Sequence, residues 1–150
     1  MNKEILALKF ACNMERFATR IYLTQCRAFS GSEIIDKLRM ASVNEKLHVE
    51  RLQKRLKELK SGPSRLGFLF RFAGIIMGFI TVGLGKLFIL NIDTWIEKKA
   101  IKDYGSFIKK LNFDTGTEKL LRNIIKDEEK HVKTLQNSIK ILKGKSKGKS

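Results

Sequence analysis

The chain has 150 residues, with 31 Lys and Arg against 15 Asp and Glu, a net charge of +16 and an isoelectric point near 10.1. This length fits one domain, and the charge favours an anionic partner surface such as an acidic membrane leaflet or nucleic acid. The only cysteines, Cys12 and Cys26, lie too far apart on one predicted helix to pair with each other, which argues against a disulfide-stabilised secreted domain and favours a reducing compartment.

The first predicted helix covers residues 3–29. Leu8, Ala11, Glu15, Ala18 and Tyr22 fall on one stripe at spacings of three and four. Glu15 therefore lies on the apolar side of this helix.

The second predicted helix follows a break at residues 30–32 and runs to about Lys60, with Ser30 and Glu33 expected to form a capping box. Its apolar stripe contains Glu45 and His48, a Glu-x-x-His motif whose side chains share one helix face. Burying a carboxylate there without a partner costs roughly several kcal/mol of folding free energy, and a metal ion would supply the partner.

Residues 66–92 are the most apolar part of the chain, but their uncharged core, residues 72–85, is shorter than the roughly 20 residues of a membrane span. We therefore predict a segment that lies in the membrane interface. It would also form a substrate entrance. The side chains expected at this entrance are Phe68, Phe72, Phe79 and Ile80. The alternative is a buried connector packed on the bundle, which Gly74, Gly78, Gly83 and Gly85 would permit.

The third predicted helix covers residues 93–111 and carries Glu97 on its apolar stripe. The fourth ends at about Leu142 and carries a second Glu-x-x-His motif, Glu128 to His131. We expect residues 1–142 to form the folded domain and the basic residues 143–150 to be disordered.

The two halves of the chain repeat each other. Glu15 and Glu97 each open the pattern Glu-x-x-Ala-x-x-x-Tyr, which ends at Tyr22 and Tyr104, the only tyrosines. A Glu-x-x-His from each of two helices, with one Glu from each of two others, is the ligand set of di-iron carboxylate bundles. We predict an all-α four-helix bundle that binds two iron ions. The predicted ligands are Glu15, Glu45, His48, Glu97, Glu128 and His131. Tyr22 and Tyr104 would either hydrogen-bond these ligands or simply fill the core.

This order of motifs, with a glycine-rich apolar stretch between the halves, resembles the demethoxyubiquinone hydroxylases, membrane-associated members of the ferritin-like superfamily. Residues 15–22 are similar to their first-helix signature and residues 72–86 to their apolar connector. The similarity covers residues 5–140. The chain departs from that family at residues 11–14, where Ala-Cys-Asn-Met replaces the usual Asp-His-Ala-Gly, and in its Lys/Gly/Ser tail, which replaces a further apolar helix.

The resemblance implies an O2-dependent di-iron monooxygenase that hydroxylates a polyprenyl quinol in ubiquinone biosynthesis. It also implies a peripheral membrane protein, on the cytoplasmic face of a bacterial inner membrane or the matrix face of a mitochondrial one. Expected partners are the lipid surface and either further copies of the chain or an accessory lipid-binding protein.

Two other functions fit parts of the sequence. Rubrerythrins share both motifs, so a peroxidase or ferroxidase without an organic substrate is the main alternative, although the chain has no Cys-x-x-Cys pair for a rubredoxin-type donor. A basic nucleic-acid-binding protein would explain the charge but not the buried motifs. Because basic residues occur on most segments instead of one face, we do not favour nucleic acid as a partner.

Overall fold

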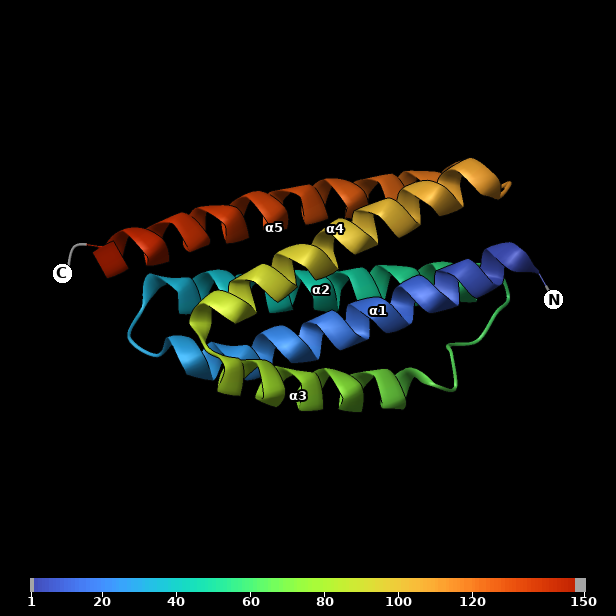
Figure 1. Ribbon diagram of the computed structural model, residues 1–150. Coiled ribbons are helices and arrows are strands. Elements are labelled where there is room, and N and C mark those ends of the chain that lie inside the picture. Colours follow the sequence, from blue (N-terminus) through green and yellow to red (C-terminus); the bar gives the residue numbers. More distant parts are fainter. Residues whose placement is uncertain (1, 148–150) are drawn as a thin grey trace.

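The computed structural model describes residues 2–147, and within them it contains only helices (Figure 1). The elements in chain order are α1 (Lys3–Gln25), a 3-10 turn (Cys26–Phe29), α2 (Glu33–Glu58), α3 (Gly67–Leu84), α4 (Lys86–Lys110) and α5 (Thr115–Lys147). The predicted all-α class is confirmed.

Helices α1, α2, α4 and α5 form a four-helix bundle made of two hairpins, and α3 lies along the outside of α1 (Figure 1). The apolar core is divided into two clusters. One contains Tyr22, Phe29, Leu38, Ile89, Leu90 and Leu135. The other contains Leu8, Leu52, Leu56, Tyr104, Leu121 and Ile124. Side chains at spacings of three and four bring these residues to the bundle interior, as the sequence predicted.

The cap of α2 differs from the prediction. Ser32, instead of Ser30, accepts a hydrogen bond from the Ile34 amide and precedes the first helical residue. Gly31 has a φ of +73°, a backbone conformation that glycine adopts without strain. Ser30 and Gly31 therefore form a turn before the helix. The prediction assigned the cap to the first serine of the break, whereas the turn moves the start of the helix by two residues.

The predicted apolar segment 66–92 is divided between two helices. Gly85, with a φ of +95°, ends α3, and α4 begins at Lys86 instead of the predicted Asp93. Ile89 and Leu90 are fully buried in the bundle core. Only the part before Gly85 is therefore an addition to the bundle. Composition could not reveal this boundary because the apolar residues continue across it.

Helix α3 has two different faces. Gly74 and Gly78 pack against the α1 backbone, where an added Cβ would lie 2.5 Å from the Phe17 carbonyl oxygen and 2.6 Å from Thr24 Cβ. The other face exposes large apolar side chains: Phe68, Leu69, Phe72, Ile76, Met77, Phe79, Ile80 and Leu84. The buried-connector alternative is thus correct for the glycine face. The exposed face keeps the membrane-interface hypothesis as a prediction, and α3 is the one helix of residues 2–147 whose length and composition would suffice to cross a membrane.

A buried polar cluster also ties α3 to the bundle. The Gln25 side-chain amide donates to Thr81 Oγ1 of α3 (3.0 Å) and to Asp93 Oδ1 of α4 (2.9 Å). Asp93 is fully buried. Burial raises the pKa of its carboxyl to about 8, against the opposing effect of the Gln25 hydrogen bond, so the group is mostly protonated at neutral pH.

Replacing Gly74 with alanine should destabilise the packing of α3 on α1. The added Cβ meets the backbone of α1, which cannot rotate away, so we expect the free energy of unfolding to fall by about 1–3 kcal/mol. Gly83→Ala is the matched control, because nothing lies within 4 Å of its Cβ position and alanine favours the helix by up to about 1 kcal/mol. Urea unfolding followed by circular dichroism measures both, and equal stability of the two variants would contradict the close packing.

The C-terminal helix is longer than predicted. It continues to Lys147, five residues beyond Leu142, so residues 143–147 belong to α5. The remaining residues of the predicted tail, 148–150, lie outside the described residues.

Candidate metal centre

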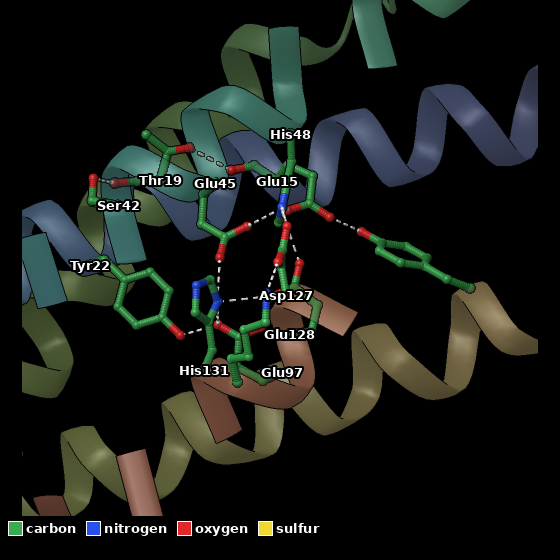
Figure 2. Close-up of polar contacts among 12 residues, drawn as sticks. Glu15, Thr19, Tyr22, Ser42, Glu45, His48, Glu97, Asp127, Glu128 and His131 are labelled. Carbon is green, nitrogen blue, oxygen red and sulfur yellow. Dashed lines mark hydrogen bonds and ion pairs between the residues drawn. The ribbon is translucent and has the colours of Figure 1, made fainter. Parts of the chain in front are cut away.

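The six predicted ligands come together in the middle of the bundle, between the two apolar clusters (Figure 2). Glu15 comes from α1 and Glu97 from α4, while α2 and α5 each supply one Glu-x-x-His pair. Their ligand atoms form two groups, each with all atoms within 4.8 Å of one another. The first group is Glu15, Glu45, His48 and Glu128, and the second is Glu45, Glu97, Glu128 and His131. Glu45 and Glu128 belong to both groups.

Both histidines present the same ring nitrogen to the carboxylates. His48 Nδ1 lies 3.3 Å from Glu15 Oε2, 3.2 Å from Glu45 Oε2 and 3.2 Å from Glu128 Oε1. His131 Nδ1 lies 2.9 Å from Glu45 Oε1, 2.9 Å from Glu128 Oε2 and 3.5 Å from Glu97 Oε1. The Nδ1 atom of each histidine thus faces three carboxylate oxygens, which is the arrangement of ligands around one cation.

The charge of the site requires compensation. The four carboxylates are only 1–2% exposed, and two histidines can neutralise at most two of them. Two oxygens, Glu45 Oε1 and Glu128 Oε1, receive no hydrogen bond, although each lies close to a histidine nitrogen. Two ligands of one ion face each other in this way, with an oxygen atom beside a nitrogen atom and no hydrogen-bond geometry between them. The residues therefore fit a pair of metal ions.

Burial and the charges of neighbouring groups control how the four carboxylates hold protons. Burial raises the pKa of Glu15 and Glu97 well above the usual range, and the nearby carboxylates of Glu45 and Glu128 raise it further. Burial also acts to raise the pKa of Glu45, but its close contacts with Glu15, His131 and His48 outweigh burial and hold the pKa below its usual range. Protons shared among the carboxylates thus supply part of the compensating positive charge, and metal binding would release them.

Burial acts on the pKa values of the histidines in the opposite sense from its effect on the carboxylates. Burial would lower the pKa of His48, but its contacts with Glu128, Glu15 and Glu45 outweigh burial and raise the pKa. For His131 the contacts with Glu128, Glu45 and Glu97 likewise outweigh burial and raise the pKa to about 12. Metal ions would have to displace these protons as well, so iron uptake is expected to weaken as the pH falls.

The two tyrosines bond the glutamates in a crossed arrangement. Tyr22 Oη donates to Glu97 Oε1, and Tyr104 Oη donates to Glu15 Oε1, so each tyrosine contacts the glutamate of the other half of the chain. Both phenols are buried, and burial followed by the charge of that glutamate raises their pKa. They therefore remain hydrogen-bond donors that fix the orientation of the two single glutamates.

Asp127 is a residue of the site that the motifs did not identify. Its Oδ2 lies 3.4 Å from His48 Nε2, the ring nitrogen that points away from the carboxylates. Asn44 occupies the corresponding position of the first motif, and its side-chain oxygen is buried without a hydrogen-bond partner. The signal in the sequence is that a polar residue precedes the Glu of both motifs.

Replacing Asp127 with alanine should weaken iron binding without abolishing it. A carboxylate on the outer nitrogen of a ligand histidine fixes its ring and tautomer, and its loss lowers metal affinity by about 10–100-fold. Asp36→Ala, an exposed change on α2 outside the site, should leave affinity unchanged. Competition with a calibrated chelator measures both, and wild-type affinity in the Asp127 variant would show that this contact does not orient His48.

Two cavities approach the site. One, of about 190 Å³, lies between α1 and α4 and is bordered by all four carboxylates. Its apolar walls are formed by Phe10, Met14, Ala18, Trp95, Ile96 and Ala100. The other, of about 780 Å³, lies between α2 and α5 and reaches His131 and Asp127.

The predicted entrance residues Phe68, Phe72, Phe79 and Ile80 line neither of these cavities. They lie on the exposed face of α3, which packs on the side of α1 that carries Phe17 and Thr24, while Glu15 and Tyr22 are buried in the bundle. The cavity that meets the carboxylates opens between α1 and α4, so the predicted entrance residues lie apart from it, and an entrance at α3 stays a prediction.

Comparisons with known proteins give a family and a fold for this chain. The family model described as ubiquinone biosynthesis protein COQ7 matches residues 12–143. Among solved structures, the chain is similar to the bacterioferritin-related protein from Bacteroides fragilis, described as a dodecameric thioferritin. The TM-score is 0.79 and the identity 19%, over 97% of this chain and 89% of that chain, which shows a ferritin-like fold. A search of curated proteins gave no match.

Proposed function

Because this chain belongs to the family of the ubiquinone biosynthesis protein COQ7, we propose that it is an O2-dependent di-iron monooxygenase that hydroxylates the ring of a demethoxy polyprenyl quinol. The observation that carries the proposal is the junction of a buried Glu4His2 cluster with an apolar cavity. The cluster fits two metal ions, and the cavity would bring an organic ring to the carboxylate side of that cluster. Family membership supports ubiquinone biosynthesis as the pathway.

Each side chain of the cluster has a role in this proposal. Glu15 and His48 would hold one iron, Glu97 and His131 the other, and Glu45 and Glu128 would bridge them. Carboxylate and imidazole ligands suit redox-active iron, which would activate O2. One oxygen atom of O2 would enter the ring, and the other would leave as water with two protons and two electrons from an external reductant. Tyr22 and Tyr104 would keep Glu97 and Glu15 in the orientation that leaves the α1–α4 side accessible.

The α1–α4 cavity would bind the quinol ring. Its volume of about 190 Å³ suits one aromatic ring, and its walls are mostly apolar, so the ring would displace water from the carboxylates. Trp95, which is 59% exposed, and Phe10, which is 40% exposed, stand at its rim. The polyprenyl tail would leave the cavity past these two side chains.

The proposed location is a membrane surface, either the cytoplasmic face of a bacterial inner membrane or the matrix face of a mitochondrial one. The exposed apolar face of α3 and the net charge of +16 support attachment to an anionic leaflet. The Bacteroides neighbour is described as a dodecamer, which supports a further proposal that copies of this chain associate. An accessory lipid-binding protein is the alternative partner.

A peroxidase or ferroxidase without an organic substrate is the second candidate. It would use the same six ligands, and the similarity to a bacterioferritin-related protein favours it. The α1–α4 cavity distinguishes the two candidates, because a small inorganic substrate does not need an apolar space of this size next to the carboxylates.

Expression in a bacterial strain that lacks its demethoxyubiquinone hydroxylase tests the proposal, with quinones measured by mass spectrometry. We expect the wild-type chain to restore ubiquinone and Glu97→Ala to abolish it. Lys98→Ala, which changes the adjacent exposed residue, should restore it fully. Accumulation of the demethoxy precursor with iron-loaded, well-expressed wild-type protein would reject the hydroxylase and favour the peroxidase.

A further inference from the structure

A basic hollow of about 440 Å³ lies where α1, α2 and the beginning of α3 meet. Five of its lining residues are cations from three helices and the loop before α3: Arg16, Arg20, Lys46, Arg65 and Arg71. Glu50 is the one acid among the residues that line it. The hollow therefore has a formal charge of +4, from five positive charges and one negative charge.

These cations are not neutralised by the protein itself. Within residues 2–147, none of the five forms an ion pair within 4.0 Å, although other arginines of the chain, such as Arg55 and Arg122, do. Like charges held close together repel one another, and an anion in the hollow would relieve that repulsion.

One wall of the hollow is built around an arginine. Arg16 Nη1 donates to Asn13 Oδ1 (3.0 Å), and Asn13 Nδ2 donates to Ser64 Oγ in the loop before α3 (2.9 Å). The guanidinium lies directly on Gly67, where an added Cβ would be only 1.9 Å from Nη1. The first residue of α3 thus leaves space for a fixed guanidinium, a group that binds phosphate through paired hydrogen bonds.

The hollow is continuous with the apolar face of α3. Phe68 lines it and is 68% exposed, and Phe72 follows one turn later at 61%. The exposed row then continues along the helix through Ile76, Phe79, Ile80 and Leu84. A molecule that fits both surfaces has an anionic group at one end and apolar chains at the other.

We propose that this hollow binds the phosphate of an anionic phospholipid, with the acyl chains of that lipid against the exposed face of α3. The site lies apart from the metal cluster and does not depend on the proposed enzymatic activity. It would fix the position of the chain on the bilayer, because one lipid headgroup is held between three helices. General attraction between a basic protein and an anionic surface does not require such a hollow.

Vesicle flotation with the iron-loaded full chain tests this proposal. The probes are vesicles of phosphatidylcholine alone and vesicles containing phosphatidylglycerol at fixed salt. The pocket variant combines Arg20→Gln and Arg71→Gln, whose side chains form no hydrogen bond or ion pair within the described residues. The control variant combines Arg51→Gln and Lys54→Gln, two exposed α2 residues outside the hollow, so the net charge changes equally.

We expect the pocket variant to lower partitioning onto phosphatidylglycerol vesicles at least about tenfold more than the control variant, with equal binding to phosphatidylcholine. Soluble glycerol phosphate should compete with the phosphatidylglycerol vesicles for binding to the wild-type chain but not for binding to the pocket variant. Equal losses in the two variants would overturn the proposal in favour of general electrostatic attraction. Tight binding of glycerol phosphate with no difference between the variants on vesicles would instead assign the hollow to a free phosphate.

Discussion

Replacing Glu128 with alanine should reduce bound iron from about two ions per chain to well below one. Glu128 contributes an oxygen to both ligand groups, one near His48 and one near His131, so its loss damages both metal positions at once. The measurement is elemental analysis after anaerobic loading with ferrous iron and removal of excess metal.

Glu129→Ala is the matched control for this change. Glu129 is the next residue of α5, is exposed, and belongs to neither ligand group, so this variant should keep its iron. Circular dichroism of both apoproteins checks that α5 remains folded. Full iron in the Glu128 variant, or iron-free wild-type protein under loading conditions, would contradict the proposed centre.

Replacing Ala100 with phenylalanine should abolish quinol hydroxylation while leaving the iron in place. Ala100 lines the cavity but offers no ligand atom, and an added ring would occupy much of its 190 Å³. Displacing a substrate by about 1 Å already costs about a hundredfold in rate, so we expect kcat/KM to fall by at least about that factor. The assay is turnover of a short-chain demethoxyquinol, with iron content measured on the same sample.

Ala73→Phe provides the corresponding control, because Ala73 is exposed on α3 and does not line the cavity. Its activity should match that of the wild type. A fully active Ala100 variant would show that the ring is not bound between α1 and α4, and would direct attention to the cavity between α2 and α5. Loss of iron together with activity would mean that the added ring disturbs the ligands.

The positions of the six candidate ligands were predictable because helical periodicity alone determines them. In a chain with two histidines, each three residues after a Glu on an apolar stripe, the buried face of each helix is fixed by the flanking side chains. The structure brings all six together as that pattern predicts.

Contacts between the two halves of the chain could not be predicted from the sequence. Tyr22 lies seven residues after Glu15 in the repeated pattern, yet it bonds Glu97 on another helix. Seven residues span about 10 Å along a helix axis, so a tyrosine reaches across the bundle more easily than back along its own helix. The contact between Asp127 and His48 was not predicted for the same reason, since it joins α5 to α2.

The boundary between α3 and α4 shows a second limit. The residues before and after Gly85 are both apolar. Those before it, in α3, pack on the outside of α1 or are exposed, whereas Ile89 and Leu90 after it are buried in the bundle core. Hydropathy does not distinguish these two environments. Only the tertiary structure shows that Ile89 belongs to the core and Phe79 to an exposed surface.

The crossed tyrosine–glutamate bonds bear on how this protein evolved. Neither hairpin contains a complete ligand group, because each group takes side chains from both α1–α2 and α4–α5. If the repeated halves descend from one ancestral hairpin, that hairpin bound metal only as a homodimer, with the centre on its two-fold axis. On that descent, gene fusion would have converted a contact between subunits into one within a chain. It would also have allowed the two copies to diverge, as the difference between Asn44 and Asp127 beside chemically identical motifs would illustrate.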